Sequence, residues 1–151
     1  MTFRAALSAL ASLSVPGVVH NYDIDAVPDD LNRPQLPALL TLPVLPAETR
    51  LSAEAGQGFR TVAFSAGPRT ATYTVTHLLL LAPSAAANGQ RSHLPDLVDL
   101  MDAYFAALSA DVTLGNNLLE PAHVTVQPGS FTYGHAAYHG CAFRHTWLIQ
   151  I

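Results

Sequence analysis

Four residues near the carboxyl end of the chain have side chains that commonly bind transition metals. They are His135, His139, Cys141 and His145. Imidazole nitrogens and thiolates are the usual protein ligands of zinc and related metals. Residues 138–151 alternate in the manner of a strand, so His139, Cys141 and His145 point to one face of it. The pattern therefore permits a metal site, and with it a small metal-binding enzyme.

The same row of side chains has a structural interpretation, which we favour. Phe143, Trp147 and Ile149 share the face, and this makes it a core face. Two hydrogen-bonded histidines at the edge of an apolar layer, with Cys141 packed as a small hydrophobic residue, would explain the row. We therefore expect no metal, no cofactor and no catalytic residue here.

Three aspartates recur at every third position of a predicted helix. Asp96, Asp99 and Asp102 lie between residues 94 and 108 and are expected opposite or beside the apolar stripe of that helix. Asp96, near the helix start, interacts favourably with the helix dipole. A solvated helix face is the favoured interpretation. Arginines of a neighbouring subunit, or a channel, are the alternatives.

His77 lies in the buried row of a strand predicted over residues 70–82. We expect a hydrogen-bonded core histidine there rather than a catalytic base. The chain contains no G-x-S-x-G elbow, no P-loop, no dinucleotide-binding fingerprint and no H-E-x-x-H motif. These absences make an enzyme the less favoured class of function.

The strand and helix that position these residues are the most strongly patterned part of the chain. Residues 70–82 alternate threonine with other residues and then become apolar on both faces, which predicts a central strand covered on both sides. The helix that follows presents a stripe made of Leu94, Leu97, Val98, Met101, Phe105 and Leu108. Together they predict an α+β fold, close to α/β, with one mixed or antiparallel sheet.

The rest of the chain supplies a second helix and shorter strands. Residues 3–14 have the spacing of an amphipathic helix, which we favour over a signal peptide. Segment 36–46 holds three prolines and is expected to be an edge strand or extended chain. Residues 59–65 should form a hairpin with the central strand. Residues 121–127 should form a short strand, followed by a loop or distorted hairpin at 128–136.

The composition suits a single domain over residues 1–151 with a buried core. Only 12% of the residues are charged, about half the usual ~25%. Self-association would hide such a surface, and a bias toward Ala, Leu and Pro is the alternative explanation. The net charge of −4 and the lack of a basic cluster disfavour sequence-specific DNA binding. No apolar run is long enough to span a membrane.

Six features follow one another along nearly the whole chain. They are the helix at the start, the acidic turn YDID (Tyr22–Asp25), LPALLTLP (Leu36–Pro43), TVTHLLLLAP (Thr74–Pro83), LPDLVDLMDAYFAAL (Leu94–Leu108) and the last strand YHGCAFRHTWLIQI. This layout resembles that of the tail terminator, or tail-completion, proteins of long-tailed (siphovirus-like) bacteriophages.

The resemblance implies a structural virion protein without catalytic residues. Members of the family form a homo-hexameric ring at the head-proximal end of the tail tube, where the ring ends tube polymerisation and joins the tail to a head completion or neck protein. Double-stranded DNA passes through the ring without being read. The expected partners are therefore copies of the chain itself, the tail tube protein and the neck protein, with no membrane.

On the same resemblance the expected location is the virion tail, after assembly in the host cytoplasm. Two alternatives remain. One is another head–tail connector, such as a stopper or neck protein. The other is the small metal-binding enzyme that would use His139, Cys141 and His145.

Overall fold

The computed structural model describes residues 3–43, 58–84 and 91–151. Within them, two α-helices and a six-stranded mixed sheet form the α+β fold that the pattern predicts. The helices are α1 (Phe3–Ala11) and α2 (Leu94–Ser109), with short 3-10 turns η1 (Arg33–Gln35) and η2 (Arg91–His93). The strands are β1 (His20–Tyr22), β2 (Ala38–Leu42), β3 (Gly58–Ala63), β4 (Thr70–Pro83), β5 (His123–Tyr133) and β6 (Ala136–Gln150).

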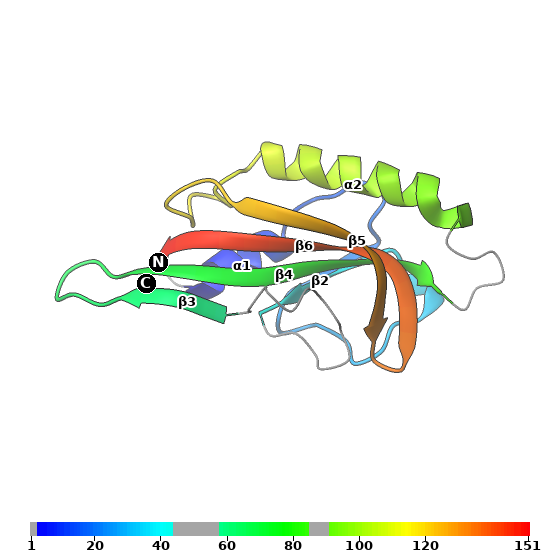
Figure 1. Cartoon of the computed structure of the whole chain (residues 1–151), viewed down its shortest axis with the longest axis horizontal. Coiled ribbons are helices and arrows are strands. Elements are labelled where there is room, and N and C mark those ends of the chain that lie inside the picture. The colour runs from blue at the N-terminus through cyan, green and yellow to red at the C-terminus, as the bar shows by residue number, and fades with distance from the viewer. Residues whose placement is uncertain (1–2, 44–57, 85–90) are drawn as a thin grey trace.

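Strand β4 is the centre of the sheet, as predicted. The strand order is β1-β2-β4-β6-β5, and β3 also pairs with β4. Only β1 and β2 are parallel, and the other pairs are antiparallel. The β4–β6 pairing extends from Thr70 opposite Gln150 to Pro83 opposite Tyr138. Figure 1 shows these two strands running side by side along most of the molecule.

Both helices lie on one face of the sheet. Tyr73 and Trp147 pack in the apolar cluster around α1, while Leu79 and Phe143 pack in the cluster beneath α2. The alternate side chains of β4, such as Leu78, face the other side, where a third cluster buries them. The aromatic end of the β5–β6 hairpin and the chain before β2 supply the cover there. The second half of β4 is thus covered on both faces, as its sequence predicts.

The face of α2 that packs on the sheet differs from the predicted stripe. Its buried residues are Leu97, Leu100 and Tyr104. Three residues of the predicted stripe are largely exposed, namely Leu94 (44%), Val98 (53%) and Phe105 (41%). Tyr104 accounts for the difference, because its ring stacks on Phe143 with the ring centroids 3.7 Å apart. This aromatic side chain, absent from the predicted stripe, sets the rotation of the helix.

Segment 36–46 was expected at a sheet edge, and this prediction is wrong for its described part. Strand β2 lies between β1 and β4, and all five of its residues are buried. Pro37 and Pro43 lie just outside the strand, so every residue within it keeps the N–H that pairing requires. The remainder of the segment, from residue 44, lies outside the described residues.

Strand β5 is longer than predicted. Residues 128–136 were expected to form a loop or distorted hairpin, but the strand continues to Tyr133 and turns tightly into β6 at Gly134 and His135. Gly134 has a φ of +61°, and a Cβ there would collide with the carboxylate of Asp30. A two-residue turn of this kind requires glycine, and the sequence analysis missed it.

The rotation of α2 can be tested with a matched pair of truncations. Leu100→Ala should lower the free energy of unfolding by about 2–4 kcal/mol, because it opens a cavity in a buried cluster. Val98→Ala, on the exposed side, should change it by less than about 0.5 kcal/mol. Urea unfolding of both variants measures the difference. Equal losses would contradict the observed rotation.

Candidate functional site

A continuous chain of hydrogen bonds crosses the interior between the sheet and the helices. Trp147 Nε1 lies 3.3 Å from His145 Nδ1, and His145 Nε2 lies 2.6 Å from the Tyr104 hydroxyl. The same hydroxyl lies 2.8 Å from His77 Nδ1. His77 Nε2 lies 2.8 Å from Asn21 Oδ1. The five side chains come from β6, α2, β4 and β1, so the hydrogen bonds tie these elements together.

The indole N–H of Trp147 determines which atoms donate and which accept along this series of hydrogen bonds. An indole N–H can only donate, so His145 accepts at Nδ1 and carries its own proton on Nε2. His145 then donates to the hydroxyl of Tyr104, which donates to His77 Nδ1. His77 Nε2–H is left to donate to Asn21. The Asn21 amide in turn donates to the carbonyl oxygens of Leu10, near the end of α1, and of Leu13, just after it.

Burial keeps the two histidines of this hydrogen-bonded network, His77 and His145, neutral. Both are fully buried. Burial lowers the pKa of His77 well below its ordinary value, and His145 nearby lowers it further. Burial also lowers the pKa of His145 to about 3. A general base must reach its substrate, and these rings face only their neighbours. The prediction of a hydrogen-bonded core role for His77 is confirmed.

The four candidate metal ligands are separated in the structure. His135 is exposed at the β5–β6 turn, where its backbone N–H donates to Asp30. His145 belongs to the buried chain described above. Cys141 packs in the apolar cluster beneath α2, and burial raises the pKa of its thiol to about 12. A buried thiol of this kind is an inert packing residue.

His139, the remaining candidate ligand, lies at the end of the β4–β6 pairing. Its Nδ1 is 3.5 Å from the Ser130 hydroxyl, and its ring centroid is 5.5 Å from that of His93. Within residues 3–43, 58–84 and 91–151, no three or more His, Cys, Asp or Glu side chains come together as a metal would require. Cys141 and His145, on the same face of β6, therefore lie in the core and have structural roles.

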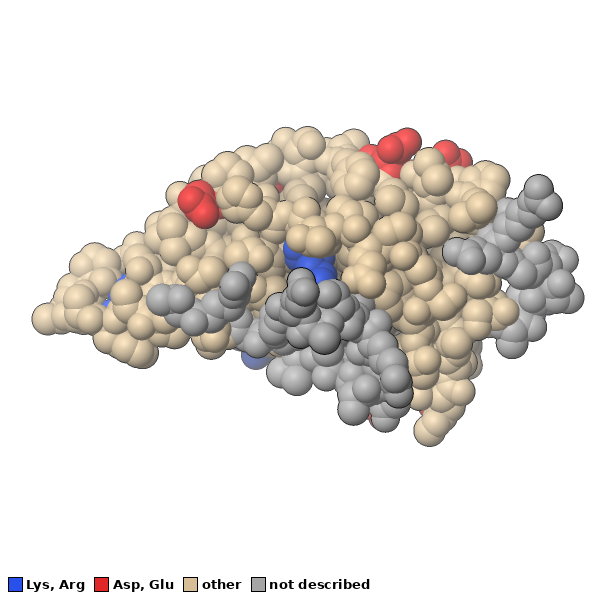
Figure 2. Space-filling model, in the orientation of Figure 1, with Lys and Arg blue, Asp and Glu red and all other residues tan. Residues whose placement is uncertain are grey.

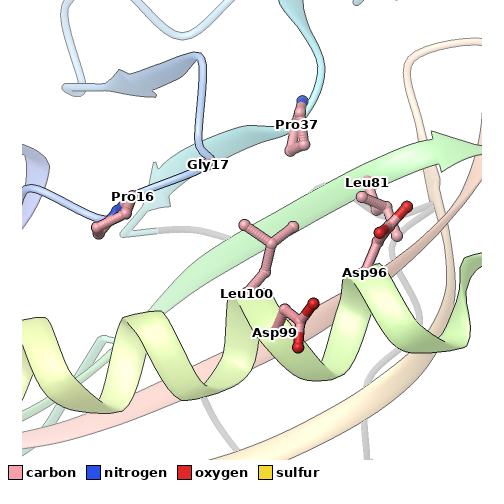
Figure 3. A pocket seen from close by; sticks show the side chains of 7 residues that line it. All are labelled: Pro16, Gly17, Pro37, Leu81, Asp96, Asp99 and Leu100. Carbon is pink, nitrogen blue, oxygen red and sulfur yellow. The ribbon is translucent and has the colours of Figure 1, made fainter.

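Two of the predicted aspartates border a surface pocket of about 270 Å³. It is lined by Pro16, Gly17, Pro37, Leu81, Asp96, Asp99 and Leu100. Figure 3 shows Leu100 projecting from α2 toward the Gly17 turn, with both carboxylates on the same helix. The lining contains no cation and no nucleophile, so the two carboxylates do not make a catalytic set. Asp96, Asp99 and Asp102 are exposed, in keeping with the predicted solvated face.

The most distinctive surface is a set of exposed apolar side chains on α2 and on the connection to β5. This apolar strip consists of Leu94, Val98, Phe105, Val112 and Leu119, which are 41–53% exposed. Beside it, a second pocket of about 280 Å³ opens between α2 and β5. Its lining residues are Phe105, Leu108, Ser109, Val112, Ala122, Val124 and Val126. We call this the α2–β5 pocket.

Two further properties distinguish the region of the strip. Strand β5 is an edge strand, because within the described residues it pairs only with β6. The charges along residues 94–126 are all acidic, namely Asp96, Asp99, Asp102, Asp111 and Glu120, with no Lys or Arg. Figure 2 shows acidic groups along the upper margin of the molecule, over α2. Grouped exposed apolar side chains and uncovered strand edges are typical of protein–protein contacts.

The sequence pattern placed Leu94, Val98 and Phe105 of the strip in the core, and it gave no role to Val112 and Leu119. The signal that could have revealed it is the width of the apolar pattern on α2. Leu97, Leu100 and Tyr104 fill one face of the helix, and Leu94, Val98 and Phe105 form a second stripe beside it. A helix with a single buried face needs only one such stripe.

Comparison with known proteins gives no match to a protein-family model, a curated protein or a solved structure. Neither α-helix in the described part of the chain has the length and apolar character needed to cross a membrane.

The buried histidines predict how stability depends on pH. Their pKa values are lowered in the folded state, so between about 6.5 and the folded values the unfolded chain binds more protons. The free energy of unfolding should thus decrease as the pH falls below 6.5, by up to about 1.4 kcal/mol per pH unit for each histidine. Urea unfolding at pH 7, 6 and 5 measures this slope.

A variant separates this effect from other titrations. His145→Gln removes one of the two groups, and its slope between pH 6 and 5 should be about half that of the wild type. An unchanged slope in the variant would show that His145 does not titrate as its burial requires.

Proposed function

We propose that the chain is a structural, self-associating subunit of a bacteriophage tail, of the tail terminator class. In this role it forms a homo-hexameric ring at the head-proximal end of the tail tube, ends tube polymerisation and joins the tail to a head completion or neck protein. The observation that carries the proposal is the apolar strip beside the open edge of β5. The layout of the chain, which resembles that family, supplies the biological setting.

The exposed apolar strip favours a subunit whose strip is buried against another protein chain in the assembled state. Each apolar side chain removed from water contributes roughly 25 cal/mol per Å² of buried surface. Five such side chains lie along α2 and its connection to β5. Interfaces of obligate assemblies are larger and more apolar than ordinary protein surface. The low share of charged residues, 12%, agrees with this.

The buried polar groups favour a structural role over an enzyme. Tyr104, His77 and His145 have their hydrogen-bonding atoms directed at one another, away from solvent. Cys141 is held as a thiol with a pKa raised to about 12. The pocket lined by Asp96 and Asp99 contains no cation and no nucleophile beside these carboxylates. These groups hold the fold and leave none poised for proton transfer or nucleophilic attack.

The charge distribution suits a conduit for DNA. Non-specific attraction to DNA comes from Lys and Arg that neutralise phosphates and release counterions. The chain carries a net charge of −4, and the exposed region around α2 is acidic. A ring of such subunits would let DNA pass without holding it. Another head–tail connector, such as a stopper, is the second candidate, since the same strip would serve any ring of the neck.

Electron microscopy of the purified protein, alone and mixed with tail tubes, tests the proposal. The expected result is closed rings with an open centre, found at one end of each tube. Rings that bind the neck protein but never a tube end would favour the stopper. Particles without rotational symmetry, and bare tube ends, would contradict both connector roles.

A further inference from the structure

A hairpin projects from the sheet beyond the rest of the described structure. The loop joining β3 to β4 lies at the far left of the view in Figure 1, away from both helices. We call residues 63–69 the arm. Every residue of the arm is exposed, and Phe64 is 75% exposed, the largest value among the large apolar side chains described.

The base of the hairpin is packed against the domain, and a hydrogen bond orders its tip. Phe59, at the start of the hairpin, packs against Phe3 and Tyr73 with ring centroids 5.2 Å and 4.7 Å apart. At the tip, the Ser65 hydroxyl donates to the Pro68 carbonyl oxygen over 2.7 Å. An aromatic side chain held out on a pre-ordered support loses little entropy when it binds.

The α2–β5 pocket has the size and chemistry to accept this side chain. Its volume of about 280 Å³ is near the lower limit for ligand cavities, which suits one large side chain. Val112, Val124 and Val126 supply apolar walls, and Phe105 supplies an aromatic one. Aromatic rings pack favourably in offset or edge-to-face arrangements.

The charges around the two features are complementary. The arm contains one arginine, Arg69, which is exposed, and no acidic residue. The pocket is flanked by Asp102 one turn before Phe105 and by Glu120 just before Ala122, both exposed. Opposite charges at the rim of a contact steer association and fix its register.

The arm cannot fill the pocket of its own chain. Val126 of the pocket pairs with Phe143, and Phe143 pairs with His77 of β4. Val124 of the pocket likewise pairs with His145, which pairs with Val75 of β4. The arm ends just before Thr70, five to seven residues from these positions along β4, which is roughly 16–23 Å at the rise of a strand. An arm that fills the pocket therefore belongs to another molecule.

We infer that the arm of one copy of this chain inserts Phe64 into the α2–β5 pocket of the next copy. The two surfaces differ, so the contact is heterologous, and its repetition closes a ring or extends a filament. The inference rests on the self-association in the proposed function and names the surfaces that carry it.

Cysteine cross-linking between two differently tagged copies tests the contact directly. One copy carries Ala66→Cys in the arm, and the other carries Ser109→Cys at the pocket. The native Cys141 is fully buried and does not compete. The expected result is rapid formation of the mixed disulfide dimer under mild oxidation. The matched control replaces Ser109→Cys with Ala26→Cys, an exposed site in the loop after β1, and should cross-link slowly. Equal rates would overturn the contact.

Substitutions in the intact protein test the energetics. Phe64→Ser should weaken self-association at least about 30-fold in sedimentation velocity, as for an interface hot spot, with an unchanged melting temperature. Arg69→Glu should weaken it about tenfold, and Glu120→Arg in the same chain should restore it. An oligomer that persists unchanged in Phe64→Ser would refute the docking while leaving the ring intact. Cross-linking at the predicted pair without rings would retain the docking and refute the terminator role.

Discussion

The structure depends on the β4–β6 pairing and on the hydrogen bonds that cross it. His77 on β4 and His145 on β6 are joined by the hydroxyl of Tyr104, which α2 carries into the interior. A buried polar group left without its partner destabilises the folded state by about 1–3 kcal/mol. A misplaced α2 would leave several such groups unpaired at once. Asn21 extends the same chain to the end of α1. Complete networks of this kind specify one arrangement of the elements.

Sequence reasoning could predict the features that have a local pattern. The central strand, the two helices and the β3–β4 hairpin follow from periodicity and turn residues. The rotation of α2 could not be predicted, because it depends on Tyr104, whose partners are remote. His77 and His145 are 27 and 41 positions away from Tyr104, and Asn21 is 56 positions from His77. No spacing rule connects residues so far apart.

The sheet edges show a second limit of sequence reasoning. The prolines of segment 36–46 indicated an edge, but they flank β2 and leave its interior free to pair. Residues 128–136 were expected to form a loop or distorted hairpin, yet β5 continues as the edge strand to Tyr133 before the turn into β6. An edge strand tolerates a proline because one side of it need not donate. Which strand is at the edge is decided by the whole sheet.

The interior and the surface of the molecule have separate tasks. The side chains from Trp147 to Asn21 pair with one another inside, while the apolar strip and the arm outside have no counterpart in the described residues. We propose that other copies of the chain cover them. Native mass spectrometry of the purified protein, with and without tail tubes, measures the number of copies in the assembly. We expect a hexamer in at least one of these conditions. A monomer at every concentration in both conditions would contradict it.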